Sequence, residues 1–211
     1  MDSATIAMVL MASGVFYIIC SLFLWKPMRE GKNELIAALF AFLVYQAINM
    51  FAMGLEVQTM NMNFAYVSAL AILIGSTYML KFPLSSFSQK TRRFAFTLSL
   101  IVVLGLFVWF IQTPESQNTI MTFALWYDLI INGLIVGGFM LLLAIRTVER
   151  YMRIKALGGG SGVIACCVVA NGAILSGAMP VAVMFGFLAP ILIVGSLMFT
   201  RRGEAGVKAF G

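Results

Sequence analysis

Seven long apolar runs are the feature that most limits what this chain can fold into. They cover residues 5–25, 34–54, 63–80, 94–112, 119–145, 162–179 and 181–200. A helix of about 20 apolar residues crosses a hydrocarbon core about 30 Å thick and satisfies its own backbone hydrogen bonds there. Only 10% of the residues are charged, against about 25% in soluble proteins. We predict an all-α membrane protein, with seven transmembrane helices in one compact bundle (1–200) and a short basic tail (201–211).

The break between the sixth and seventh runs rests on a short segment, from Gly177 to Pro180. Glycine and proline together favour a turn there. If the turn did not form, the two runs would merge and the count would fall to six.

Connections that carry lysine and arginine alternate with connections that carry neither. The first, third and fifth connections and the tail carry three, four, four and three, which accounts for all 14. Cytoplasmic connections of membrane proteins are enriched in these residues. The pattern predicts an N-terminus outside and a C-terminus in the cytoplasm. We expect an integral protein of a plasma membrane, the inner membrane of a bacterium.

Asp128 is the carboxylate that lies well inside an apolar run. A carboxylate at mid-membrane costs roughly 2.5–3.5 kcal/mol on insertion scales and usually serves a function. Asn132 follows four residues later, on the same helix face. Gly133 and Gly137 form a G-x-x-x-G step on a neighbouring face, which predicts close approach of another helix.

Other polar residues fall in the predicted outer half of the bundle. Gln46, Asn49 and Glu56 lie on one stripe of the second helix. Together these residues predict an outward-opening polar pocket. Its candidate ligand-binding residues are Asp128, Asn132, Gln46, Asn49, Glu56, Tyr66 and Asn171. The alternative is that they hydrogen-bond to one another and serve packing alone.

The fifth run continues into a basic segment. We expect one unbroken helix from Asp128 to Arg153, ended by the glycines of 158–160. The candidate partner-contact residues at its cytoplasmic end are Arg146, Glu149, Arg150 and Arg153.

The chain contains no histidine and no nucleophile, phosphate-binding or dinucleotide motif, so we expect no enzyme, no cofactor and no metal site. A retinal protein needs a lysine deep in the last helix, and 191–200 has none. Cys20, Cys166 and Cys167 are interpreted as small core residues, with a soft-metal or redox role as the alternative. Methionines on the outer side leave a copper(I) path as a further option.

Three function classes remain. The first is a receptor or sensor that binds a ligand from outside and signals to a cytoplasmic protein partner. The second is a non-catalytic subunit of a larger complex, with lateral contacts in the membrane. The third is a small proton- or cation-coupled transporter or channel. The lipid bilayer is a partner in each case, and no nucleic acid is expected.

Overall fold

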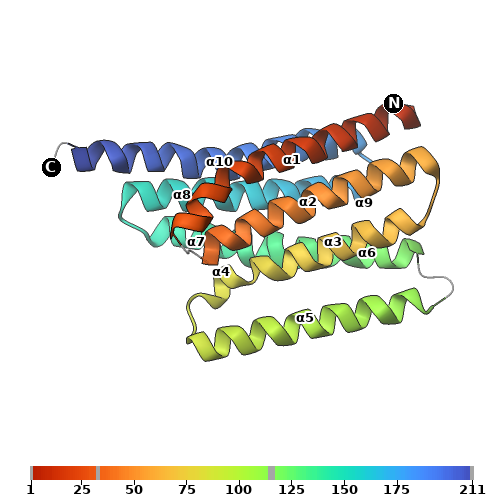
Figure 1. Cartoon of the computed structure of the whole chain (residues 1–211), viewed down its shortest axis with the longest axis horizontal. Coiled ribbons are helices and arrows are strands. Elements are labelled where there is room, and N and C mark those ends of the chain that lie inside the picture. Colours follow the sequence, from red (N-terminus) through yellow and green to blue (C-terminus); the bar gives the residue numbers. More distant parts are fainter. Residues whose placement is uncertain (1, 32–33, 114–116, 210–211) are drawn as a thin grey trace.

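The computed structural model (Figure 1) describes residues 2–31, 34–113 and 117–209, with side chains for 2–29, 34–113 and 119–198. Lys32, Pro114, Glu115 and the side chains of the predicted tail lie outside these ranges. Within them the chain is all-helical, without strands. Seven helical stretches among the described residues are long and apolar enough to cross a membrane. The predicted number of spans is therefore confirmed, and the architecture is compatible with a polytopic membrane protein.

Four spans follow single predicted runs and extend most of them. They are α1 (Ser3–Gly31), α2 (Glu34–Thr59), α3 (Asn63–Met79) with the short α4 (Lys81–Leu84), and α5 (Gln89–Ile111). The fifth and sixth spans are composite. The fifth joins α6 (Gln117–Asp128), the π-helix η1 (Leu129–Gly137) and α7 (Gly138–Arg146). The sixth joins α8 (Arg150–Ile164), the π-helix η2 (Ala165–Ala170) and α9 (Asn171–Leu175), and the seventh is α10 (Met179–Ala209).

The expectation of one unbroken helix from Asp128 to Arg153 is wrong. α7 ends at Arg146, and both Thr147 (φ −82°, ψ 124°) and Glu149 (φ −68°, ψ 119°) have extended backbone before α8 begins. Thr147 and Val148 are consecutive β-branched residues, which have low helix propensity. The sixth span therefore starts at Arg150 rather than near residue 162.

The glycines of 158–160 do not end a helix but lie inside α8. Their lack of a side chain lets other helices approach closely. A Cβ atom on Gly160 would lie 3.2 Å from the carbonyl oxygen of Gly137, and one on Gly162 would lie 2.8 Å from that of Ala189. α8 is therefore packed tightly against both the fifth span and α10.

The turn between the sixth and seventh spans is formed by residues 176–178. Gly177 has φ +77°, a conformation that glycine adopts without strain. Its N–H donates to the carbonyl of Ile174 at 3.0 Å, and the N–H of Ala178 donates to that of Ala173 at 2.7 Å. This pair of bonds is the Schellman ending of a helix. The turn keeps α9 and α10 separate, so the alternative of six spans is excluded.

Consecutive spans run antiparallel (Figure 1). The α1–α2, α4–α5 and α7–α8 connections lie at one end of the bundle, which we call the basic end because the lysines and arginines of the connections gather there. The N-terminus and the α2–α3 and α9–α10 connections lie at the other end, which we call the far end. That the basic end faces the cytoplasm remains a prediction.

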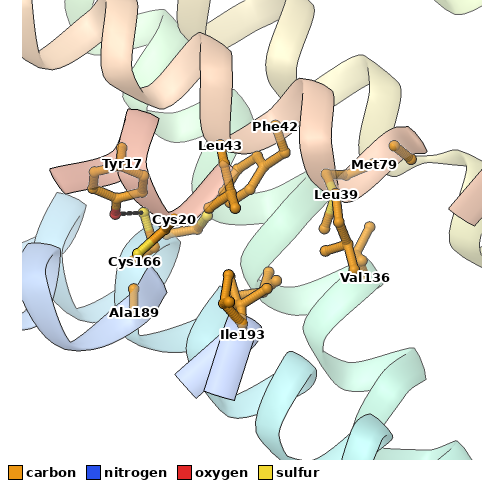
Figure 2. Packing of buried hydrophobic residues seen from close by; sticks show 14 of the residues in the cluster. Tyr17, Cys20, Leu39, Phe42, Leu43, Met79, Val136, Cys166, Ala189 and Ile193 are labelled. Atoms are coloured by element: carbon orange, nitrogen blue, oxygen red, sulfur yellow. Dashed lines mark hydrogen bonds between the residues drawn. The ribbon is translucent and has the colours of Figure 1, made fainter. Parts of the chain in front are cut away.

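The largest apolar cluster fills the half of the bundle toward the basic end. Figure 2 shows part of it, including Tyr17 of α1, Phe42 of α2 and Ile193 of α10. A second cluster joins α3, α5 and α6 nearer the far end, through Ile72, Val103 and Leu125 among others. α5 lies at the edge of the bundle, and Val103 is its one buried side chain.

Candidate functional site

Asp128 is the last residue of α6 and is buried, with 1% of its surface exposed. Its carboxylate collects hydrogen bonds from three spans. Ser76 Oγ donates to Oδ1 at 2.6 Å, Asn132 Nδ2 to Oδ1 at 2.6 Å, and Asn171 Nδ2 to Oδ2 at 2.7 Å. The thiol of Cys167 lies beside this carboxylate. We call these five residues the Asp128 centre.

The described partners of Asp128 are neutral donors. An ionised carboxylate only accepts hydrogen bonds and has about four lone-pair sites. Here two amides and the hydroxyl of Ser76 donate to it, and the same hydroxyl also lies 2.7 Å from the carbonyl oxygen of Ile72. Such bonds to a charged group are about twice as strong as neutral ones. These donors favour the charged form of Asp128, whereas its burial favours the neutral form.

One hydrogen-bond acceptor of the centre has no donor among the described residues. Asn132 has no exposed surface, and its Oδ1 has no hydrogen-bond partner among the described residues. A buried polar atom without a partner costs about 1–3 kcal/mol. The centre thus holds a spare oxygen on the same amide whose nitrogen contacts the carboxylate.

The two π-helices adjoin the centre from both sides. η1 begins immediately after Asp128, and η2 ends immediately before Asn171. They pack against each other, since Gly133 of η1 leaves no room for a Cβ beside Val168 of η2. π-helical segments are rare and are found mostly at functional sites. This pairing singles out the centre as the candidate site of the molecule.

A buried chain of side chains connects the centre to α1. Cys166 adjoins Cys167 in η2, and its Sγ lies 3.3 Å from the hydroxyl oxygen of Tyr17 (Figure 2). Cys166 and Cys167 are free thiols in the apolar core, as the interpretation of small core residues requires. Cys167 has an additional contact, with Asp128, that the sequence did not reveal.

Gln46 and Asn49 form a separate group with Ser68, which we call the amide cluster. Asn49 Nδ2 donates to Gln46 Oε1 at 3.2 Å, and Ser68 Oγ donates to Asn49 Oδ1 at 2.6 Å. Ser68 lies about two helical turns nearer the far end of α3 than Ser76, at ~1.5 Å per residue. All three side chains of the amide cluster are buried.

An apolar layer lies between the amide cluster and the Asp128 centre. On α3 it comprises Ala69, Ile72 and Leu73, and on α6 it comprises Ala124 and Leu125. The predicted pocket residues are thus divided into two buried groups. Glu56 and Tyr66 are half-buried and have no described hydrogen bond to either group.

No protein-family profile, curated protein or solved structure matches this chain. The site is therefore interpreted from its own geometry.

The predicted partner-contact residues lie at the basic end. Arg146 ends α7, Glu149 precedes α8, and Arg150 and Arg153 lie in its first turn. All four are exposed, and Val148 between them is 99% exposed. They form an accessible surface around the α7–α8 connection.

Ser76 is the residue of the centre that the sequence analysis missed outright. The sequence feature that could have indicated Ser76 is its spacing on α3. It lies eight residues after Ser68 on a mostly apolar helix, close to the same helix face. The neighbouring Thr77 Oγ1 lies 3.2 Å from the hydroxyl oxygen of Tyr127. A second polar contact between α3 and α6 therefore adjoins the centre.

Proposed function

We propose that this protein is a non-enzymatic membrane sensor whose input is the protonation or ion occupancy of Asp128. The observation that carries the proposal is a buried carboxylate held by donors from three spans and flanked by two π-helices. An ionisable group inside a membrane bundle is by default a functional group. The charge state of Asp128 decides whether Ser76, Asn132 and Asn171 have a charged acceptor.

Asymmetric surroundings support input from the far end. Toward that end, the apolar layer of small and medium side chains is backed by the polar amide cluster. Toward the basic end, the large apolar cluster that includes Phe42, Met79 and Val136 fills the bundle. Asp128 is therefore separated from the predicted outer side by a thinner apolar layer than from the basic end.

A route for the output leads through the sixth span. Asn171 and Cys167 contact Asp128, and α8 of the same span packs without a gap against α10 at Gly162. A change at the carboxylate alters the hydrogen bonds that hold η2 and α9 in place. We propose that this shifts the α7–α8 connection, where Arg146, Arg150 and Arg153 contact a cytoplasmic partner protein.

The proposal is tested with a pH-insensitive fluorophore on Val148→Cys in lipid nanodiscs. The native cysteines are buried, so the label reacts selectively. We expect a fluorescence change as pH is varied, which Asp128→Asn abolishes. Tyr17, Tyr127 and Cys167 also lie near Asp128, and the Asp128 variant separates its contribution from theirs. Glu56→Gln, which removes a carboxylate outside the centre, is the matched control and should keep the response.

No pH response at Val148, or a response that persists in Asp128→Asn, overturns the sensor proposal.

A transporter is the second candidate, and the paired π-helices favour it. Transporters bind ions at irregular helices near the midplane, and η1 and η2 supply such irregularity beside Asp128. Proton flux into liposomes that Asp128→Asn abolishes would establish this alternative. The sensor proposal predicts no flux above that of empty vesicles.

A further inference from the structure

We propose that the Asp128 centre binds a dehydrated monovalent cation of the size of sodium. The inference rests on the proposed function, because the same carboxylate is the input, and it names the ligand. The decisive observation is Asn132 Oδ1, a fully buried oxygen without a partner among the described residues, beside a carboxylate that its own amide nitrogen contacts.

The centre contains the oxygens that a hard cation requires. Asp128 supplies two carboxylate oxygens, Asn132 and Asn171 supply amide oxygens, and Ser76 supplies a hydroxyl oxygen. Hard cations take carboxylate, carbonyl and hydroxyl oxygens as ligands. These groups come from three spans and surround the carboxylate, so a cation there is enclosed by protein.

The charge of the centre selects a monovalent ion. Asp128 is its one carboxylate, and the described residues contain no group of three or more His, Cys, Asp or Glu that could hold a metal. The titratable neighbours, Tyr17, Tyr127 and the two thiols, are neutral when protonated. One positive charge cancels that of Asp128, whereas a divalent ion would leave a buried net charge, which is costly.

Binding needs a turn of two amide groups rather than a new fold. Without a cation, Asn132 and Asn171 direct Nδ2 toward the carboxylate. Rotation about the terminal torsion of asparagine, which is broad, presents Oδ1 instead. At Asn132 this gives Oδ1 the cation as a partner and moves Nδ2 to the place where Oδ1 had none.

Sodium-dependent stability tests the inference. We measure the Tm of purified protein in sodium chloride, potassium chloride and choline chloride at equal ionic strength. A ligand that binds the folded state alone raises Tm with its concentration. For sodium at ten to a hundred times its Kd we expect a saturable rise in Tm of about 3–10 °C. The rise in Tm should be smaller in potassium and absent in choline. At low pH the sodium effect on Tm should weaken, because protons compete for Asp128.

Asp128→Asn should lose the sodium effect, and Glu56→Gln should keep it. Because Asp128→Asn could fail to accumulate, binding of radioactive sodium to the unmodified protein is measured as well, with competition by protons. Equal Tm values in the three salts, or no saturable sodium binding, overturns the inference. A pH response at Val148 without sodium binding supports the sensor proposal and overturns the sodium site. Sodium binding without any response at Val148 supports the sodium site and overturns the sensor proposal.

Discussion

Gly137 packs so closely against Ile164 that a Cβ atom on Gly137 would lie 2.7 Å from Cγ1 of Ile164. Its neighbour Gly138, one residue along the same span, has nothing within 4 Å of the corresponding position. One glycine thus lies in a close interhelical contact and the other does not, although they are neighbours in the same span.

Gly137→Ala should therefore destabilise the protein by about 1–3 kcal/mol, the usual cost of overpacking a filled interior. Gly138→Ala should be neutral or stabilise it by up to ~1 kcal/mol, because alanine has the higher helix propensity. Thermal unfolding in detergent, followed by size-exclusion chromatography, measures both. Equal effects of the two substitutions would contradict the described packing of η1 on the sixth span.

Asp128→Leu should destabilise the protein by more than about 2 kcal/mol, because Ser76, Asn132 and Asn171 lose a shared acceptor and unpaired buried donors cost about 1–3 kcal/mol each. Asp128→Asn should cost less, about 1 kcal/mol, since its amide oxygen still accepts and rotation of the Asn132 amide turns an acceptor oxygen toward its new nitrogen. The two variants are compared by unfolding temperature and by yield of monodisperse protein. If leucine were tolerated as well as asparagine, the hydrogen bonds of Ser76, Asn132 and Asn171 to residue 128 would not contribute to stability.

Asp2 should give the start of α1 a pH dependence. Hydrogen bonds from the side chain and the backbone N–H of Thr5 lower the pKa of Asp2 below its ordinary value. The cap is therefore fully formed above the unfolded pKa and is lost as pH falls through the lower, folded pKa. Hydrogen exchange of the first turn should accelerate over that interval, after correction for intrinsic rates. Asp2→Asn keeps a capping oxygen and should remove the pH dependence, whereas Asp2→Ala should open the turn at every pH.

Orientation is tested by thiol labelling of intact cells. Single cysteines at Asn61, at the far end, and at Lys90, at the basic end, are both exposed, and the native cysteines are buried. An impermeant maleimide should label Asn61→Cys from outside and Lys90→Cys only after lysis. The reverse pattern would place the basic end outside and reverse the direction of sensing.

The sequence predicted what depends on composition and on local spacing. Apolar length determined the seven spans, and the four-residue separation of Asp128 and Asn132 correctly placed them in contact, at 2.6 Å. Asn171 was included for its position near mid-depth of the sixth run, and its side chain is hydrogen-bonded to Asp128. Such inferences need only the rise and period of a helix.

Features that depend on packing between helices escaped the sequence. α- and π-helices draw on the same apolar residues, and no residue pattern distinguished η1 from its flanking α-helices. The glycines of 158–160 predict a helix end, because glycine commonly ends helices in soluble proteins. Within a membrane bundle the same residues serve close contact, and only the position of α10 shows which role applies.

The order in which the partners of Asp128 leave the ribosome follows from the 43 residues that separate it from Asn171. At synthesis rates of ~5–20 residues per second, roughly 2–9 s pass between the two. During that interval Ser76 and Asn132 are already present to solvate the carboxylate, but η2 and Asn171 are not. A carboxylate buried without its full set of partners is costly, so until the sixth span is present we expect Asp128 to be protonated or in contact with water. Insertion into the membrane thus has to accommodate Asp128 before its two sixth-span neighbours, Asn171 and Cys167, are present.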